Sequence, residues 1–157
     1  MKRLLLILLA LTLLFSACGR KEKDAGINTV AGAVLESLDT ANGLTLADDD
    51  YAETNLGCDD EIDECKIYLG EEREIGIIRL DDDGNAAIAE KAIKEYLKNE
   101  ASSTTSLIEL YPSEVLEERL AHYENATIAQ KGRYICYFAL PKSEAEKAKK
   151  ALIDTLS

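Results

Sequence analysis

The sequence predicts an α+β domain: an antiparallel sheet of about four strands, built from two hairpins, with helices packed mainly on one face. Two observations predict this class. Short apolar runs alternate as strands do, residues 65–69 with 74–80 and residues 127–130 with 133–140, and a tight turn joins each pair. Segments with helical spacing stand before, between and after these pairs. The element order is therefore α-β-β-α-α-β-β-α, and hairpins separated by helices are typical of α+β proteins.

A first helix is expected over residues 27–38. Its apolar residues fall on one face at helical spacing: Ile27, Val30, Ala31, Val34 and Leu38. Asn42, Gly43 and the aspartates at 48–50 then break the helical pattern. Residues 54–64 are expected to form an acidic loop or a short helical turn.

The second strand of the first hairpin, residues 74–80, carries apolar side chains on both faces. Ile75 and Ile77 point to one face. Ile78 and Leu80 share the other, because side chains alternate along a strand. The stretch DDDGN at 81–85 ends the hairpin and begins the next helix.

That helix has a broad apolar stripe. Ile88, Ala92 and Tyr96 repeat every four residues with further apolar residues beside them, and such a stripe can pack on a sheet. The hydroxyl side chains at 102–105 are poor choices for a helix interior, so the helix either frays there or continues towards Pro112.

The last third of the chain predicts a helix over residues 113–123, the second hairpin and a final helix. The hairpin turns at Lys131-Gly132, and its second strand alternates four side chains onto one face: Tyr134, Cys136, Phe138 and Leu140. Pro141 stops this strand. Ser143 and Glu146 match the Ser-x-x-Glu capping box, which predicts the start of the final helix.

The N-terminus has the order of a secretory signal peptide. Lys2 and Arg3 precede residues 4–15, which are apolar except for Thr12, and small residues follow. Twelve helical residues extend about 18 Å, whereas the hydrocarbon core of a bilayer is about 30 Å thick. The run is therefore too short to span a membrane.

The stretch Phe15-Ser16-Ala17-Cys18 resembles a bacterial lipobox, which predicts cleavage between Ala17 and Cys18 and a diacylglycerol on the Cys18 thiol. A plain signal peptide with a chance cysteine, or an uncleaved anchor, is the alternative. The expected organisation is a signal peptide at 1–17, a polar tether at 18–26 and a single domain at 27–157. Two acyl chains anchor a protein stably, so the lipid on Cys18 is expected to hold this protein at the membrane.

The charge excludes one class of partner. The 157 residues include 18 basic and 30 acidic ones, a formal net charge of −12. Removing Lys2 and Arg3 with the signal peptide makes the mature chain more negative still. A nucleic-acid partner is not expected, because phosphate contacts need a basic face.

No catalytic constellation and no cofactor site is recognised, so an enzyme is not predicted. His122 is the only histidine, and no nucleophile marks a triad around it, so it is expected at the surface or the domain boundary. Cys58 and Cys65 either form a disulfide, worth roughly 2–3 kcal/mol, or remain two thiols. Zinc is not predicted, because a structural zinc site needs four spaced ligands. Cys136 is expected to be a buried strand residue and not a ligand.

Three acidic clusters, at 48–50, 59–64 and 81–83, could supply oxygen ligands to calcium. The EF-hand pattern fails when it starts at Asp81, because its glycine position holds Ala86 and its glutamate position holds Ala92. Solvated turns and helix caps are the favoured reading, and no metal site is predicted. Five tyrosines could line a ligand groove but are better explained as core and boundary residues: Tyr96, Tyr111, Tyr123, Tyr134 and Tyr137.

The lipobox, the strand EIGIIRL, the helix that runs into YPSE, and ENATIAQKGRYICYFAL together resemble the domain of unknown function family numbered 4358. The resemblance covers residues 27–157 and is best over 111–140. It implies a small bacterial lipoprotein, mainly of Gram-positive, clostridia-like bacteria, and it implies no known reaction.

The functional prediction is a membrane-anchored extracytoplasmic lipoprotein that serves as a non-catalytic binding or interaction module, with an unknown envelope protein as partner. The alternative is an accessory lipoprotein that binds a small ligand or a cation and works with a transporter or envelope enzyme. An uncatalogued hydrolase is the least favoured hypothesis.

Overall fold

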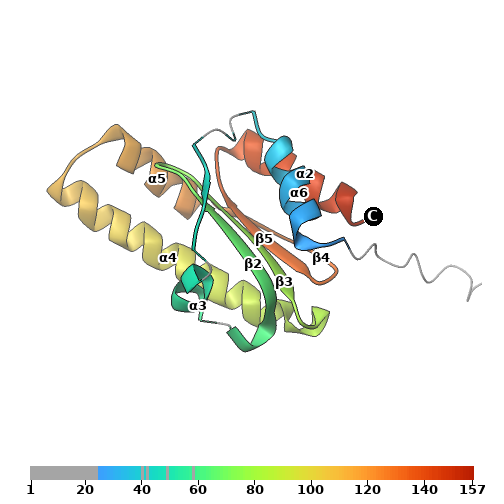
Figure 1. Ribbon diagram of the computed structural model, residues 1–157. Helices are drawn as coiled ribbons and strands as arrows, with labels where there is room; N and C mark the ends of the chain where they lie inside the picture. The colour runs from blue at the N-terminus through green and yellow to red at the C-terminus, as the bar shows by residue number, and fades with distance from the viewer. Residues whose placement is uncertain (1–24, 40, 42, 49, 58) are drawn as a thin grey trace, which may run out of the picture.

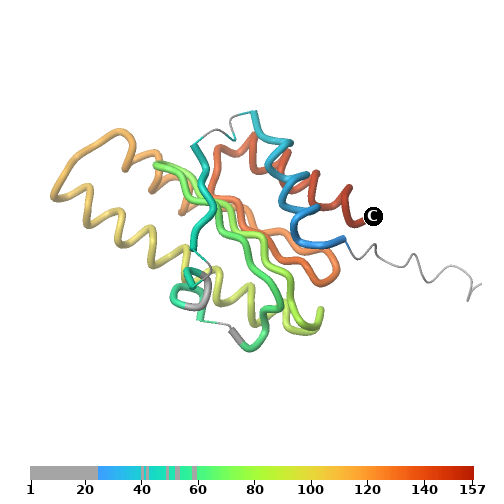
Figure 2. The backbone as a smooth tube through the Cα atoms, in the orientation of Figure 1, coloured from blue at the N-terminus to red at the C-terminus, as the bar shows by residue number. Residues whose placement is uncertain are grey.

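The computed structural model describes residues 25–157 except 40, 42, 49 and 58 (Figures 1 and 2). The predicted signal peptide, Cys18, most of the tether and Cys58 therefore lie outside the described residues. Among the described helices, none is long and apolar enough to cross a membrane.

The core of the protein is a five-stranded antiparallel sheet with the order β1-β2-β3-β5-β4. Its strands are β1 (Thr45–Leu46), β2 (Ile62–Leu69), β3 (Glu74–Leu80), β4 (Thr127–Lys131) and β5 (Tyr134–Ala139). The helices are α2 (Ile27–Glu36), α3 (Asp50–Leu56), α4 (Ala86–Leu110), α5 (Glu114–Glu124) and α6 (Lys142–Thr155). The predicted α+β class, with an antiparallel sheet built from two hairpins, is confirmed.

The structure differs from the prediction in the helix layers and in one strand. Helices cover both faces of the sheet rather than mainly one (Figure 1). The reason is that β5 is buried at all six positions and β3 at all but Arg79, so both faces of the central strands need cover. The fifth strand, β1, comes from the segment expected to be irregular and pairs with the end of β2.

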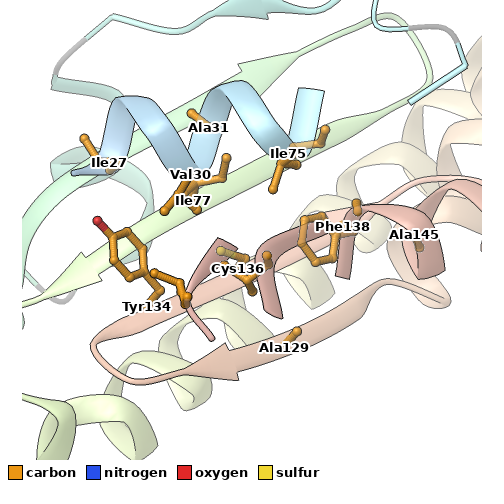
Figure 3. Packing of buried hydrophobic residues seen from close by; sticks show 14 of the residues in the cluster. Ile27, Val30, Ala31, Ile75, Ile77, Ala129, Tyr134, Cys136, Phe138 and Ala145 are labelled. Carbon is orange, nitrogen blue, oxygen red and sulfur yellow. The ribbon is translucent and has the colours of Figure 1, made fainter. Parts of the chain in front are cut away.

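One face packs against α2 and α6. Figure 3 shows Ile75 and Ile77 of β3 under α2, beside Cys136 and Phe138 of β5. The Tyr134 hydroxyl donates a hydrogen bond to the carbonyl of Ala25 and so fixes the chain just before α2. The core cluster of this face consists of hydrophobic side chains, and the buried Glu144 of α6 pairs with Arg73 at 3.5 Å.

The opposite face packs against α3, α4 and the end of α5. Ile78 and Leu80 of β3 lie here, as predicted, with Ile135 of β5 and Ile93 of α4. This layer contains the most deeply buried carboxylate among the described residues, Glu74, at the start of β3.

The long helix α4 does continue through the hydroxyl-rich stretch. The hydroxyl of Thr105 bonds to the carbonyl of Ala101 at 2.9 Å, and that of Ser106 bonds to the carbonyl of Ser102 at 3.2 Å. These bonds to the preceding turn satisfy the hydroxyls without breaking the helix. At 1.5 Å per residue the 25-residue helix is about 37 Å long, so α4 and α5 extend beyond the end of the sheet (Figures 1 and 2).

The predicted capping box of the last helix is wrong. The helix begins at Lys142 with Pro141 as its N-cap, and no side chain caps it. Pro141 has a φ of −51°, close to the helical value, so the helix starts directly after the proline and Ser143 lies inside its first turn.

Gly76 occupies a strand position where no other residue fits. It pairs with Tyr137 across β3 and β5, and a Cβ on Gly76 would lie 2.0 Å from Cε1 of the Tyr137 ring. The ring of Tyr137 therefore crosses the backbone of β3 at the space that Gly76 leaves.

We expect Gly76→Ala to lower the free energy of unfolding by about 2 kcal/mol, because the added methyl group displaces the buried Tyr137 ring. Urea denaturation measures this change. Gly32→Ala in α2 is the control, since no atom lies within 4 Å of the added Cβ and alanine stabilises a helix by about 0.5–1 kcal/mol relative to glycine. Equal losses in both variants would contradict this account of Gly76.

Candidate functional site

Glu74 is the most unusual residue in the core. Its side chain is 1% exposed, although it begins β3 and carries a carboxylate. Burying such a group without hydrogen-bond partners is costly, so buried carboxylates are normally paired or satisfied by donors. The side chains around Glu74 meet this need.

Three tyrosine hydroxyls donate to the Glu74 carboxylate. Tyr96 of α4 and Tyr137 of β5 bond to Oε1 at 2.7 and 2.5 Å. Tyr123 of α5 bonds to Oε2 at 2.8 Å. An ionised carboxylate only accepts hydrogen bonds, and three phenol donors on its two oxygens suit that form. We refer to Glu74, Tyr96, Tyr123 and Tyr137 as the tyrosine cluster.

Two further residues extend the cluster towards the surface. The hydroxyl of Tyr51 in α3 lies 3.0 Å from that of Tyr96. The guanidinium of Arg119 lies 5.8 Å from the centre of the Tyr123 ring, within the range of a cation–π contact. The Nε atom of Arg119 is buried and has no hydrogen-bond partner among the described residues. Arg119 thus brings a positive charge close to the buried carboxylate.

The electrostatics follow from this geometry. Burial, and then the Glu74 charge, raise the pKa of Tyr96, Tyr123 and Tyr137 above the usual value for tyrosine. Burial alone would lower the pKa of Arg119, but Tyr123, Glu100 and Glu74 raise it above its usual value. The pKa of Glu100 is raised by burial and then by repulsion from Glu74.

These properties indicate a structural role for the cluster. A tyrosine acts as a base only after losing its proton, and here the proton is held more tightly than in water. The cluster instead joins α4 and α5 to the two central strands, because its four members come from β3, α4, α5 and β5. It therefore sets where the α4–α5 hairpin leaves the sheet.

The outer end of that hairpin exposes large apolar side chains. Leu110 and Tyr111 are each 70% exposed at the turn between the helices. Leu107 and Val115 are exposed beside them, one on each helix. We call these four residues the hairpin tip. Along α5 only Tyr123 is buried, so the rest of this helix contributes little to the core.

The predicted chemical residues lie on three different elements. His122 is half-buried on α5, and its Nδ1 lies 2.7 Å from the backbone carbonyl of Glu72, as expected of a boundary histidine. Cys136 is fully buried in β5, and burial raises the pKa of its thiol to about 12. Cys65 is half-buried on β2. Because Cys58 lies outside the described residues, the bridge to Cys65 stays a prediction.

Some residues of the acidic clusters that could have held calcium have other partners in the structure. Asp63 bonds to Arg79 at 2.7 Å and to Arg133 at 3.1 Å, and Glu64 lies 3.4 Å from Arg79. Asp82 accepts a hydrogen bond from the Gly84 amide at 2.7 Å, as in a turn. Within the described ranges, no three histidine, cysteine, aspartate or glutamate side chains converge on a metal position.

Sequence reasoning did not single out Glu74. It assigned Tyr96, Tyr123, Tyr134 and Tyr137 to the core or boundary, which the structure confirms, and Tyr111 is instead exposed. One signal was present: a glutamate at the start of a strand that is apolar on both faces, two residues before a glycine. It does not show which residues satisfy the carboxylate.

Comparisons with known proteins find no relative of this chain. No family model, no curated protein and no solved structure matches this chain. The resemblance to the domain of unknown function family numbered 4358 therefore stays a prediction.

The tyrosine cluster predicts a loss of stability at high pH. The folded pKa values of Tyr96, Tyr123 and Tyr137 lie above the unfolded value of about 10. Above pH 10 the unfolded chain therefore releases protons that the folded chain keeps, and the free energy of unfolding falls by about 1.4 kcal/mol per pH unit for each such tyrosine.

Urea denaturation between pH 8 and 11 measures this dependence. Tyr96→Phe is expected to reduce the slope above pH 10 by the contribution of one tyrosine, about 1.4 kcal/mol per pH unit. Tyr111→Phe removes an exposed hydroxyl outside the cluster and is expected to keep the wild-type slope. Identical slopes in wild type and Tyr96→Phe would show that the cluster does not hold its protons as described.

Proposed function

We propose that this protein is a membrane-anchored extracytoplasmic lipoprotein whose domain is a non-catalytic interaction module at the envelope of a Gram-positive bacterium. The lipobox supports the anchor, with cleavage after Ala17 and lipid on Cys18. The resemblance stated above supports the bacterial envelope. The anchor holds the domain within reach of other membrane proteins at the outer face of the cytoplasmic membrane.

The hairpin tip is the observation that supports the interaction role. Single exposed apolar residues are common on protein surfaces, but four neighbouring ones at the end of a projecting hairpin are not. The tyrosine cluster holds the base of this hairpin against the sheet. A rigid base and an apolar end suit a surface that docks into another protein.

The charges around the tip indicate the kind of partner. All charged residues between 99 and 118 are acidic: Glu100, Glu109, Glu114, Glu117 and Glu118. An anionic lipid surface would repel such a tip, so the membrane itself is a poor match. The matching surface is an apolar patch rimmed by lysine or arginine on an envelope protein.

The alternative function, an accessory lipoprotein that binds a cation, has less support. Asp63 and Glu64, which could have been cation ligands, pair with arginines instead.

A photo-reactive phenylalanine analogue at Tyr111 tests the interaction role in living cells that express the full chain. We expect a cross-link to one defined membrane protein, and we expect Leu107→Ser to abolish it by weakening the docking surface. The matched control is the same analogue at Ile88, which is 52% exposed at the other end of α4. No cross-link at Tyr111, or the same products from both positions, would contradict the proposal.

Intact mass of the native protein tests the anchor separately. We expect a chain that begins at Cys18 and carries a diacylglycerol, and Cys18→Ala should release it from the membrane. A mature chain that begins elsewhere or carries no lipid would refute the anchor, without bearing on the tip.

A further inference from the structure

A groove lies between α4 and the β4 edge of the sheet, away from the hairpin tip. Lys94, Leu97, Lys98 and Ala101 of α4 form one wall at helical spacing. Tyr123, Ala126 and Ile128 form the opposite wall. The groove has a volume of about 530 Å³, and its lining is apolar apart from Lys94 and Lys98 on one wall and Glu124 at the end of α5. We call it the α4–β4 groove.

The strand beside this groove has an open edge. β4 is the last strand in the sheet order, and it is five residues long, whereas β1 at the opposite edge has only two. Open edges of this length can pair with another extended chain. The groove therefore adjoins the longer of the two sheet edges.

The register identifies which backbone groups face outwards. β4 and β5 are joined by the two-residue turn Gly132-Arg133, in which Gly132 has a φ of 55°. Lys131 and Tyr134, which flank such a turn, exchange hydrogen bonds with each other, and the pattern then alternates along the hairpin. The N–H and C=O groups of Ile128 and Gln130 consequently point away from β5. No hydrogen bond joins them to another residue in the described part of the chain.

The charge at the groove is opposite to that of the protein as a whole. The chain has a formal net charge of −12, yet Lys94 and Lys98 stand one turn apart on the α4 wall. Lys94 also contacts Glu90 at 2.6 Å on the exposed side of the helix. Glu124 is the only acidic residue of the lining. The lining thus carries a small net positive charge, and the outward backbone groups of Ile128 lie at its β4 wall.

We propose that the α4–β4 groove binds an extended peptide segment of a partner, which adds to β4 as a sixth strand. The backbone of the peptide pairs with Ile128 and Gln130. Its alternate side chains are apolar and enter the groove beside Leu97 and Ala101, and its carboxylates lie near Lys94 and Lys98. A groove alone would accept many apolar molecules, but the open donors and acceptors of β4 match the regular spacing of an extended backbone.

A random decapeptide library displayed on phage, panned against the full-length chain in lipid nanodiscs, tests this proposal. We expect enriched sequences in which apolar and acidic residues alternate. A synthetic peptide of the enriched sequence should protect the outward-facing amides of Ile128 and Gln130 from hydrogen exchange. Lys98→Glu should weaken its binding about fivefold, since it turns an attraction into a repulsion.

Position 130 gives a matched pair of variants, because the Gln130 side chain is exposed. Gln130→Pro removes the outward N–H and leaves the β4–β5 hydrogen bonds in place, so affinity should fall about tenfold. Gln130→Ala keeps the N–H and should bind like wild type. If Gln130→Pro does not fold, hydrogen exchange in the wild-type complex tests strand addition instead. Protection of the Ile128 and Gln130 amides by the peptide supports it, and unchanged exchange there excludes it.

The other outcomes overturn the proposal. A library without enrichment, or peptides that bind Gln130→Pro as well as Gln130→Ala, would exclude strand addition. Binding of octanoate that depends on Lys98, without any peptide binding, would make the groove a small-molecule site. Peptide binding that is lost in Leu107→Ser but kept in Lys98→Glu would belong to the hairpin tip, so failure here leaves the proposed function standing.

Discussion

A buried carboxylate determines how one helical layer is attached to the sheet. Glu74 lies in the core at the start of β3 and accepts hydrogen bonds from tyrosines of α4, α5 and β5. The apolar residues of this layer would bury themselves in several similar arrangements, because the hydrophobic effect has no direction. The hydrogen bonds do have direction, and leaving one unmade in the core costs about 1–3 kcal/mol. They therefore select one position for α4 and α5.

The two proposed binding surfaces both depend on that position. The hairpin tip lies at the far end of the helices that Tyr96 and Tyr123 attach, and Tyr123 also lines the α4–β4 groove. Gly76 belongs to the same constraint, since only a glycine leaves room for the Tyr137 ring over β3. On the opposite face, the core between the sheet and the helices α2 and α6 is hydrophobic. Non-directional apolar packing attaches these two helices.

The local elements could be predicted from the sequence, whereas their long-range partners could not. Strand β3 and helix α5 follow from alternation and helical spacing, which are properties of neighbouring residues. Strand β1 has two residues and is stable only through its pairing with β2, so no local pattern marks it. The tyrosines that satisfy Glu74 are 22, 49 and 63 residues away along the chain, and only the folded topology brings them together. Tyr111 resembles the core tyrosines in sequence, and its exposure follows from the length of α4 beyond the sheet.

Hydrogen exchange of Glu74→Gln, followed by mass spectrometry, tests the central claim most directly. The amide offers one acceptor oxygen instead of two, so at least one phenol loses its acceptor. The account predicts faster exchange in α5 and in the adjoining part of α4, with α2 and α6 unchanged, and no such change in the control Glu72→Gln. Exchange that rises equally in all helices, or that leaves α5 unchanged, would contradict the claim that Glu74 holds this layer in place.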